Sequence, residues 1–203
     1  MKRVVEKGTG NASMNKSKFV AYLFPCASEE AIPSLLAEIK KSSPKADHYP
    51  YAYAVGSKKK SSDDGEPGGT GGRPLLQLLE GECLDQAFLC VARYFGGTKL
   101  GTGNLRRCFV EAGADAIANA RLGEEKERYA YSFSVSYSDY EALKRLSSRA
   151  HFVIENAVFG ENVETTLSSG DKLDAVFETL RITPAPEATR QIVIVEIPNN
   201  ERH

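Results

Sequence analysis

Apolar residues in the first quarter of the chain change from strand-like to helical spacing and back. Residues 19–24 are continuously apolar and aromatic and end at Pro25, which predicts a buried strand. Apolar residues then recur at helical spacing between 32 and 39, behind Ser28 and two glutamates that suit a helix N-terminus. Tyrosines alternate with small residues from 49 to 55, the spacing of a half-exposed strand. The chain is therefore expected to begin with a strand, a helix and a strand.

The pattern stops after Gly56. Residues 57–73 contain no apolar residue except Pro67, so this stretch is predicted to be a loop. Beyond it, the spacing predicts a short helix that starts with proline, a strand, a second glycine-rich turn and a long alanine-rich helix, at residues 74–80, 87–95, 96–103 and 105–120. The long helix is expected to close a first domain over residues 1–123.

The remaining residues form a second pattern after a charged stretch, 122–127, that is expected to be a linker. Strands and helices are predicted in the order β-α-β-β-α-β, at residues 129–137, 138–149, 152–160, 163–167, 171–180 and 191–197. Ser138 and Glu141 resemble a capping box at the first of these helices. This order is typical of a ferredoxin-like domain, predicted over residues 128–203. The fold class is therefore α+β with two domains.

Composition narrows the functional classes. Hydrophobic residues make up 41% of the chain, which is sufficient for packed cores, but there is no membrane-length apolar run or signal peptide, so a cytoplasmic protein is expected. The four cysteines form no C-x-x-C pair, so neither a zinc site nor a disulfide framework is predicted. Residues 1–126 carry 18 Lys and Arg against 15 Asp and Glu, whereas residues 127–203 carry 8 against 12. Any nucleic-acid contact must therefore come from local clustering of charge.

Two glycine-rich segments are the candidates for function. The first glycine segment, residues 62–74, places Asp63, Asp64 and Glu66 among successive glycines. Carboxylates are ligands for hard cations such as Mg²⁺, and glycines let backbone N–H groups approach an anion. The alternative is a mobile, solvated connection between a strand and a helix. The spacing fits neither a dinucleotide fingerprint nor a P-loop.

The second glycine segment, residues 93–107, has the strand, turn and helix order that can hold an anion at a helix N-terminus. It is not a P-loop, because the Lys-Ser/Thr pair is missing. Its cations could contact phosphates while an aromatic residue stacks on a base. The alternative is that Tyr94 and Phe95 are core residues at the end of a strand. His48, beside the predicted second strand, is expected to be a hydrogen-bonding residue rather than an acid–base group.

Together the two segments resemble the signature of the YigZ/IMPACT family, S-D-D-G-E-P-x-G-T-A-G-x-P followed by V-R-Y-F-G-G-x-K-L-G-x-G-G-L-x-R. The resemblance covers most of residues 16–120 and extends to His48 and the Ala52-Tyr53 pair. Two positions depart from the pattern. Gly71 replaces an alanine, and Asn104 replaces a glycine at a position where the glycine of the family pattern suggests positive φ.

The resemblance implies a two-layer α/β first domain, like the second domain of a small-subunit ribosomal protein and domain IV of elongation factor G. It also implies a link to translation, since eukaryotic members regulate it through protein partners and bacterial members have been suggested to bind nucleic acid. No catalytic residue comes with the family. The predicted binding surface, from both segments, comprises Asp63, Asp64, Gly65, Glu66, Pro67, Thr70, Arg73, Arg93, Tyr94, Phe95, Gly96, Gly97, Lys99, Gly101, Arg106 and Arg107.

Three functional hypotheses follow. The leading one is a translation-linked protein, not an enzyme, that binds RNA or a ribosome-associated partner, with Arg93, Lys99, Arg106 and Arg107 on phosphate and with no metal, cofactor or membrane partner. The second is an enzyme or small-molecule binder that holds a metal and a phosphorylated ligand on the carboxylates of the first glycine segment. The third is a protein-interaction module that docks its partner on the acidic second domain. The sequence leaves the oligomeric state open.

Overall fold

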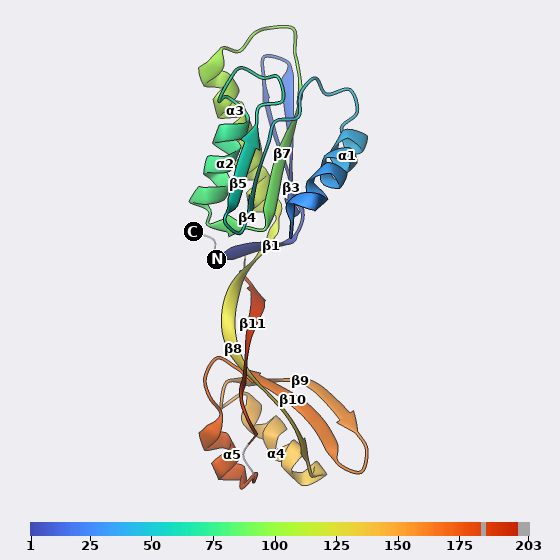
Figure 1. Ribbon diagram of the computed structural model, residues 1–203, viewed down its shortest axis with the longest axis vertical. Helices are drawn as coiled ribbons and strands as arrows, with labels where there is room; N and C mark the ends of the chain where they lie inside the picture. Colours follow the sequence, from blue (N-terminus) through green and yellow to red (C-terminus); the bar gives the residue numbers. More distant parts are fainter. Residues whose placement is uncertain (184–185, 199–203) are drawn as a thin grey trace. The chain divides into compact units, whose positions relative to one another are not determined.

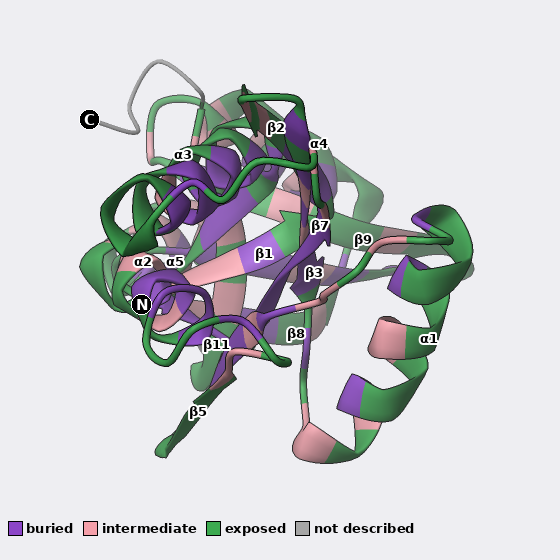
Figure 2. Cartoon of the chain, turned by 90° about the horizontal axis from the view of Figure 1, so that it is seen from above, coloured by how far each residue is buried: buried purple, intermediate pink, exposed green. Residues whose placement is uncertain are grey.

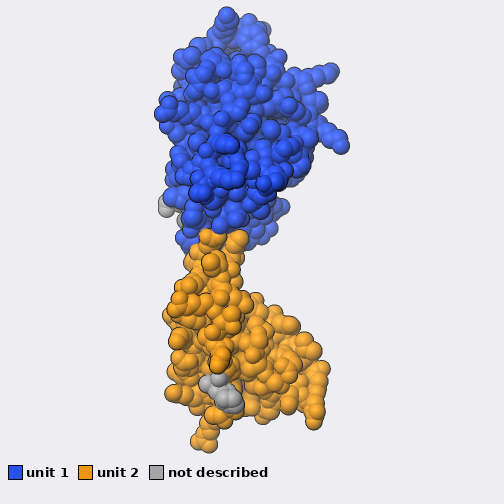
Figure 3. All heavy atoms as spheres, viewed as in Figure 1, with its two compact units in different colours: residues 1–124, 195–203 blue, residues 125–194 orange. Residues whose placement is uncertain are grey.

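The structure, a computed structural model, describes residues 1–183 and 186–198. The chain divides into two compact units (Figure 3). Unit 1 comprises residues 1–124 together with the described residues from 195 onward, and unit 2 comprises residues 125–194. Both units combine helices with a sheet, so the predicted α+β class is confirmed. Residues 199–203, the end of the predicted second domain, lie outside the described residues.

Unit 1 is built on a five-stranded antiparallel sheet with the order β2-β3-β7-β4-β5. Its strands are Gly8–Met14, Ser17–Pro25, Ala87–Tyr94, Tyr51–Val55 and Lys58–Ser62, in that spatial order. The central strand β7 is buried along nearly its whole length, in agreement with the apolar run that predicted it.

Helices cover both faces of this sheet (Figure 1). Helices α2 (Gly72–Gly81) and α3 (Thr102–Asn119) pack on one face, where the ring of Phe19 meets that of Phe109 edge to face with centroids 5.1 Å apart. A 3₁₀ turn, η1 (Glu29–Ala31), leads into α1 (Ile32–Ser42), which covers the other face. Figure 2 shows that α1 buries only a narrow stripe of its surface. Alternate residues of β3 and β7 therefore enter two separate cores, and α1 adds a layer to the α2/α3 layer and the sheet.

Two strands of this sheet differ from the expectation drawn from the hydrophobic pattern. Strand β5 begins inside residues 57–73, which were predicted to be a loop, and its three lysines are exposed. An edge strand that is exposed on both faces has no apolar alternation to reveal it, and lysines protect such an edge from pairing with another chain. Strand β2 is rich in glycine and was not predicted either. It can lie directly against α3 because a side chain at Gly10 would meet the helix backbone at 2.2 Å.

The predicted linker is also a strand. Residues 122–127 lie within β8 (Arg121–Val135), whose first residues pair antiparallel with β1 (Lys2–Glu6). Strand β1 also pairs in parallel with the short strand β6 (Leu84–Asp85). Asp85 is buried where these strands meet, with its carboxylate 2.6 Å from Arg3 Nη1 and accepting a hydrogen bond of 2.7 Å from the backbone N–H of Gly56. Leu122 is buried, whereas the charged residues 124–127 occupy exposed or half-buried positions of the strand.

Unit 2 has the predicted β-α-β-β-α-β order. After β8 come α4 (Tyr137–Ser147), β9 (Phe152–Phe159), β10 (Val163–Ser169), α5 (Asp174–Leu180) and β11 (Thr189–Glu196). The strands lie in the order β11-β8-β10-β9, the arrangement of a ferredoxin-like sheet. One core joins the sheet to both helices around Tyr131 and Phe177. The N-cap of α4 is Ser136, whose Oγ accepts from the Asp139 N–H, not the expected Ser138. Across the described residues, none of the helices has the length and apolarity to cross a membrane.

Candidate functional site

Asp63 organises the first glycine segment. Its carboxylate accepts hydrogen bonds from the backbone N–H groups of Gly69, Gly71 and Gly72 at 2.8, 3.0 and 2.8 Å. Burial raises the pKa of the Asp63 carboxyl, but the three N–H donors together outweigh this effect, so the pKa lies below its usual value. A side chain at Gly72 would lie 2.5 Å from the carbonyl oxygen of Ser62, which explains the need for glycine there. Asp63 therefore shapes the segment from within.

The neighbouring Asp64 ties the same segment to the residues that precede β4. Its carboxylate accepts from the Tyr49 N–H at 2.7 Å, and its backbone carbonyl lies 2.7 Å from Nδ1 of His48. A carbonyl can only accept, so Nδ1 carries the proton in this contact. Gly65 lies against the His48 ring, where a side chain would approach to 3.1 Å. His48 thus makes a positioning hydrogen bond, the role expected from the sequence.

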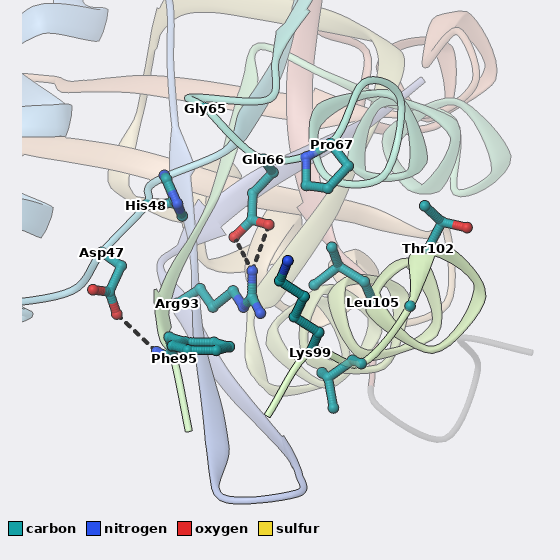
Figure 4. Close-up of a pocket in the computed structure, with 12 residues that line it drawn as sticks. Asp47, His48, Gly65, Glu66, Pro67, Arg93, Phe95, Lys99, Thr102 and Leu105 are labelled. Carbon is teal, nitrogen blue, oxygen red and sulfur yellow. Dashed lines mark hydrogen bonds and ion pairs between the residues drawn. The ribbon is translucent and has the colours of Figure 1, made fainter. Parts of the chain in front are cut away.

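Glu66 and Arg93 join the two glycine segments through a buried ion pair. Nη1 of Arg93 donates to both carboxylate oxygens of Glu66, at 2.7 and 2.5 Å (Figure 4). The Glu66 side chain is 1% exposed and that of Arg93 is 9% exposed. The guanidinium also lies over the rings of Phe19 and Phe95, at 5.7 and 5.6 Å from their centroids. Removal of either charged partner would leave the other uncompensated in a buried position.

The second glycine segment turns back to begin α3. The Phe95 N–H donates to the Asp47 carboxylate at 2.7 Å, and the Gly96 N–H donates to Oγ of Ser17 at 3.0 Å. A side chain at Gly96 would meet the backbone of Lys16 at 2.3 Å. Gly101 has φ of 75° and is the N-cap of α3 without a side-chain hydrogen bond. The first turn of an 18-residue helix therefore begins with its N–H groups uncapped by a side chain.

A cavity of about 440 Å³ lies between the two glycine segments. Gly65, Glu66 and Pro67 border it from the first segment, and Arg93, Phe95, Lys99 and Gly101 border it from the second (Figure 4). These seven of the predicted surface residues are brought together. Five further wall residues were not part of the predicted surface, namely Asp47, His48, Leu100, Thr102 and Leu105. The helical spacing of residues 105–120 predicts that Leu105 lies on the apolar side of a helix. Nothing in the sequence around Asp47 indicates that this residue borders a cavity.

The other predicted surface residues lie outside the cavity wall. Asp63 and Asp64 hold the first segment, as does Thr70, whose Oγ1 donates to the Pro67 carbonyl at 2.6 Å. The exposed Arg73 and Arg107 do not border the cavity, and Arg106 donates to Gln77 at 2.9 Å. The Tyr94 hydroxyl is 3.5 Å from the Pro44 carbonyl, and Gly96 and Gly97 form the turn. Of the four cations expected on phosphate, Arg93 and Lys99 border the cavity.

The two departures from the family pattern are accommodated. A side chain at Gly71 would lie 2.6 Å from Cβ of Pro50, so this backbone has room for glycine and not for alanine. Asn104 lies in the first turn of α3 and is not among the residues with positive φ. Its Nδ2 donates to the Leu100 carbonyl at 3.1 Å. The expectation that residue 104 needs a positive φ was therefore wrong for this chain.

The three carboxylates considered as metal ligands do not converge. Asp63 faces glycine N–H groups, Asp64 faces the Tyr49 N–H and Glu66 faces Arg93. Among the residues that the structure describes, no group of three or more His, Cys, Asp or Glu is placed to hold a metal ion. This geometry gives the metal-dependent alternative no support.

Three exposed lysines lie on the loops at one end of unit 1, and one of them, Lys99, borders the cavity. This loop end consists of the β2–β3 turn, residues 43–48, residues 63–70 and residues 95–101 (Figure 1). Lys16, Lys45 and Lys99 are exposed there and make no ion pair within the described chain. The acidic residues nearby accept hydrogen bonds from backbone N–H groups or pair with Arg93, and in the described part of the chain none of them forms an ion pair with these three lysines.

Comparison with known proteins places the two glycine segments in a family. The family model described as the Impact N-terminal domain matches residues 15–117. An "IMPACT family member in pol 5'region" of Thermus thermophilus is 35% identical over 154 residues, which cover 76% of this chain and 84% of that protein. An IMPACT family member of Haemophilus influenzae is 29% identical over 189 residues, 91% of each chain. A crystal structure of a hypothetical protein shares the fold, with a TM-score of 0.57 and 22% identity over 97% of this chain and 98% of that one.

Proposed function

The chain belongs to the IMPACT family, and on that premise we propose that it acts in translation by binding RNA at the loop end of unit 1. The family resemblance implies the link to translation, since eukaryotic members are regulators of translation. It also implies nucleic acid as a ligand class for bacterial members. Both family motifs contribute residues to the loop end. A binding function that members of the family share is therefore expected on this surface.

The observation that carries this proposal is a set of exposed lysines at the loop end. Lys16, Lys45 and Lys99 come from three separate segments, and all are exposed without an ion pair among the described residues. By contrast, Lys2 and Lys59 elsewhere in unit 1 are paired with glutamates at 3.3 and 3.1 Å. Lysines held near a polyanion attract its phosphates over several ångströms, and this attraction is weakened by salt.

The aromatic residue at the loop end favours a single strand over a duplex. Phe95 is 47% exposed at the cavity, beside the guanidinium of Arg93. Unpaired bases stack on exposed aromatic rings while lysines contact the backbone, a mode that tolerates many sequences. A metal-dependent reaction gains no corresponding support, because the three carboxylates point to different partners.

The test is the salt dependence of RNA binding. Anisotropy of a labelled single-stranded RNA is measured with the full chain over a series of KCl concentrations. The double variant Lys16→Ala/Lys45→Ala is expected to bind more weakly at every salt concentration. Its salt slope should fall by about 0.7 for each phosphate contact that is lost.

Lys172→Ala provides the matched control, because Lys172 is an exposed lysine of unit 2 that makes no ion pair within the described residues. Its removal changes the net charge of the chain without touching the loop end, so the RNA affinity should stay close to that of the wild type. The proposal fails if the wild type shows no salt-sensitive RNA binding. It also fails if Lys172→Ala lowers the salt slope as much, for each lysine removed, as the loop-end variant does.

A further inference from the structure

Arg93 has more hydrogen-bond donors than the chain satisfies. A guanidinium carries N–H donors on Nε and on both terminal nitrogens. Within the described residues, Glu66 is the only acceptor for this side chain, and both hydrogen bonds come from Nη1. Nε is buried without a hydrogen-bond partner, and the side chain as a whole is only 9% exposed. Nη2 also makes no hydrogen bond within the described residues, and Arg93 borders the cavity. Buried donors are nearly always satisfied in folded proteins, so a guanidinium with these unused donors points to an acceptor supplied from outside the chain.

Two further positive groups border the same cavity. Lys99 is exposed and makes no ion pair among the described residues, and α3 begins at Thr102 with a positive helix-dipole end. In Figure 4 the side chains of Lys99 and Arg93 approach each other beside Glu66, with Thr102 on the same side. Asp47 lies on the other side of Phe95, with its carboxylate turned to the Phe95 N–H. The part of the cavity next to Lys99 is therefore positive and supplies donors from three directions.

We propose that this part of the cavity binds the phosphate group of a nucleotide. A phosphate monoester offers three strong acceptor oxygens, which suit donors that converge from Lys99, the start of α3 and the free N–H groups of Arg93. Glu66 keeps its own bonds to Nη1 and holds the guanidinium in place. The proposal deepens the proposed function and rests on it in taking the ligand to be a nucleotide.

The size and lining of the cavity fit a group larger than phosphate alone. Its volume of about 440 Å³ lies within the range of roughly 300 to 1,000 Å³ that is usual for small-molecule sites. Pro67, Leu100 and Leu105 give it an apolar wall, against which a nucleoside can pack once its phosphate is fixed. The same chemistry is present in a free nucleotide and in the phosphorylated end of an RNA chain, and the experiment distinguishes these two sources.

The experiment follows backbone amide shifts of the full chain by NMR during titration with AMP, and separately with adenosine. AMP is expected to move the amide signals of residues 101–104, and adenosine is not. In parallel, two RNAs that differ only in a 5′ phosphate or a 5′ hydroxyl are compared by anisotropy. Lys99→Gln removes the charge of an exposed side chain, and it should weaken AMP binding about tenfold or more.

Lys172→Gln is the matched control, since it removes the charge of an exposed lysine of unit 2 that makes no ion pair within the described residues. It should leave AMP binding unchanged. Preference for the 5′-phosphorylated RNA together with an AMP response assigns the site to an RNA end. A response to AMP without binding of either RNA assigns it to a free nucleotide and overturns the proposed RNA binding alone. If AMP and adenosine have equal effects, and both RNAs bind equally in a salt-dependent manner, the phosphate site is refuted and the proposed function stands.

Discussion

Breaking the ion pair between Glu66 and Arg93 should destabilise unit 1 more than breaking any of its exposed pairs. In Glu66→Gln the side chain keeps its size but loses its charge, and Arg93 stays buried at 9% exposure opposite a neutral amide. Breaking one side of a buried pair costs about 3 to 5 kcal/mol, and the low end applies because glutamine can still accept one hydrogen bond from Nη1. A loss of about 3 kcal/mol corresponds to a population of unfolded molecules more than about 100-fold larger.

Native-state hydrogen exchange of β7 measures this loss inside unit 1. Strand β7 lies in the middle of the sheet and is almost fully buried, so its amides exchange chiefly when unit 1 unfolds. A probe within one unit is needed because a chain with two compact units does not meet the condition for two-state unfolding of a single domain. Exchange of residues 87–94 in Glu66→Gln is expected to be about 100 times faster than in the wild type.

Glu82→Gln is the matched control for this prediction. Glu82 pairs with Lys2 at 3.3 Å, but the two side chains are 43% and 29% exposed, so the pair contributes at most about 1 kcal/mol. Exchange of β7 should then rise less than about fivefold. The reasoning is refuted if the two variants accelerate β7 exchange equally, since burial of the pair would then carry no energetic weight.

Two further predictions concern the packing and the pH dependence of unit 1. Gly10→Ala would place a methyl group 2.2 Å from the backbone nitrogen of Ala116 and should cost about 1 to 3 kcal/mol in the same exchange assay, whereas Gly68→Ala meets nothing within 4 Å and should cost almost nothing. Equal stability of these two variants would contradict the packing of β2 on α3. The lowered pKa of Asp63 means that its carboxylate stabilises the fold above the unfolded-state pKa of about 3.9, and that this contribution is lost as the pH falls through the folded-state pKa. Asp63→Asn should therefore lower the melting temperature at pH 7 but narrow the gap to the wild type on acidification, and a gap that does not change with pH would contradict this role.

The family and the α+β class were predictable because they depend on local patterns. The two glycine segments hold enough fixed spacings to identify the IMPACT family, and comparison with known proteins confirms it. The alternation of residues 129–137 and the helical spacing of residues 171–180 were sufficient to predict the ferredoxin-like order. In each such pattern the apolar residues recur on the side of the helix or strand that packs against a neighbouring layer. The pattern is therefore visible within a few consecutive residues.

Exposed elements were the ones that the sequence did not reveal. Strand β5 was predicted to be a loop. Residues 122–127 were predicted to be a linker, and the boundary between the two units does fall among them, but they form the start of β8. Strand β5 is held by backbone pairing with β4, and the first residues of β8 are held by pairing with β1. Backbone pairing requires no hydrophobic alternation, so the exposed residues of these strands carry no such pattern.

For the site, the sequence supplied the residue types, and only the tertiary structure decided what each residue does. Glu66 and Arg93 are 27 positions apart, and nothing local indicates that each is the partner of the other. The fold placed Arg93 in a buried ion pair beside the cavity, left Lys99 exposed beside the start of α3, and turned Asp63 inward to its own glycines. The physical reason is that burial of a strand face is encoded locally by periodicity, whereas the pairing of charges depends on which segments the packed sheet and helices bring within hydrogen-bonding distance.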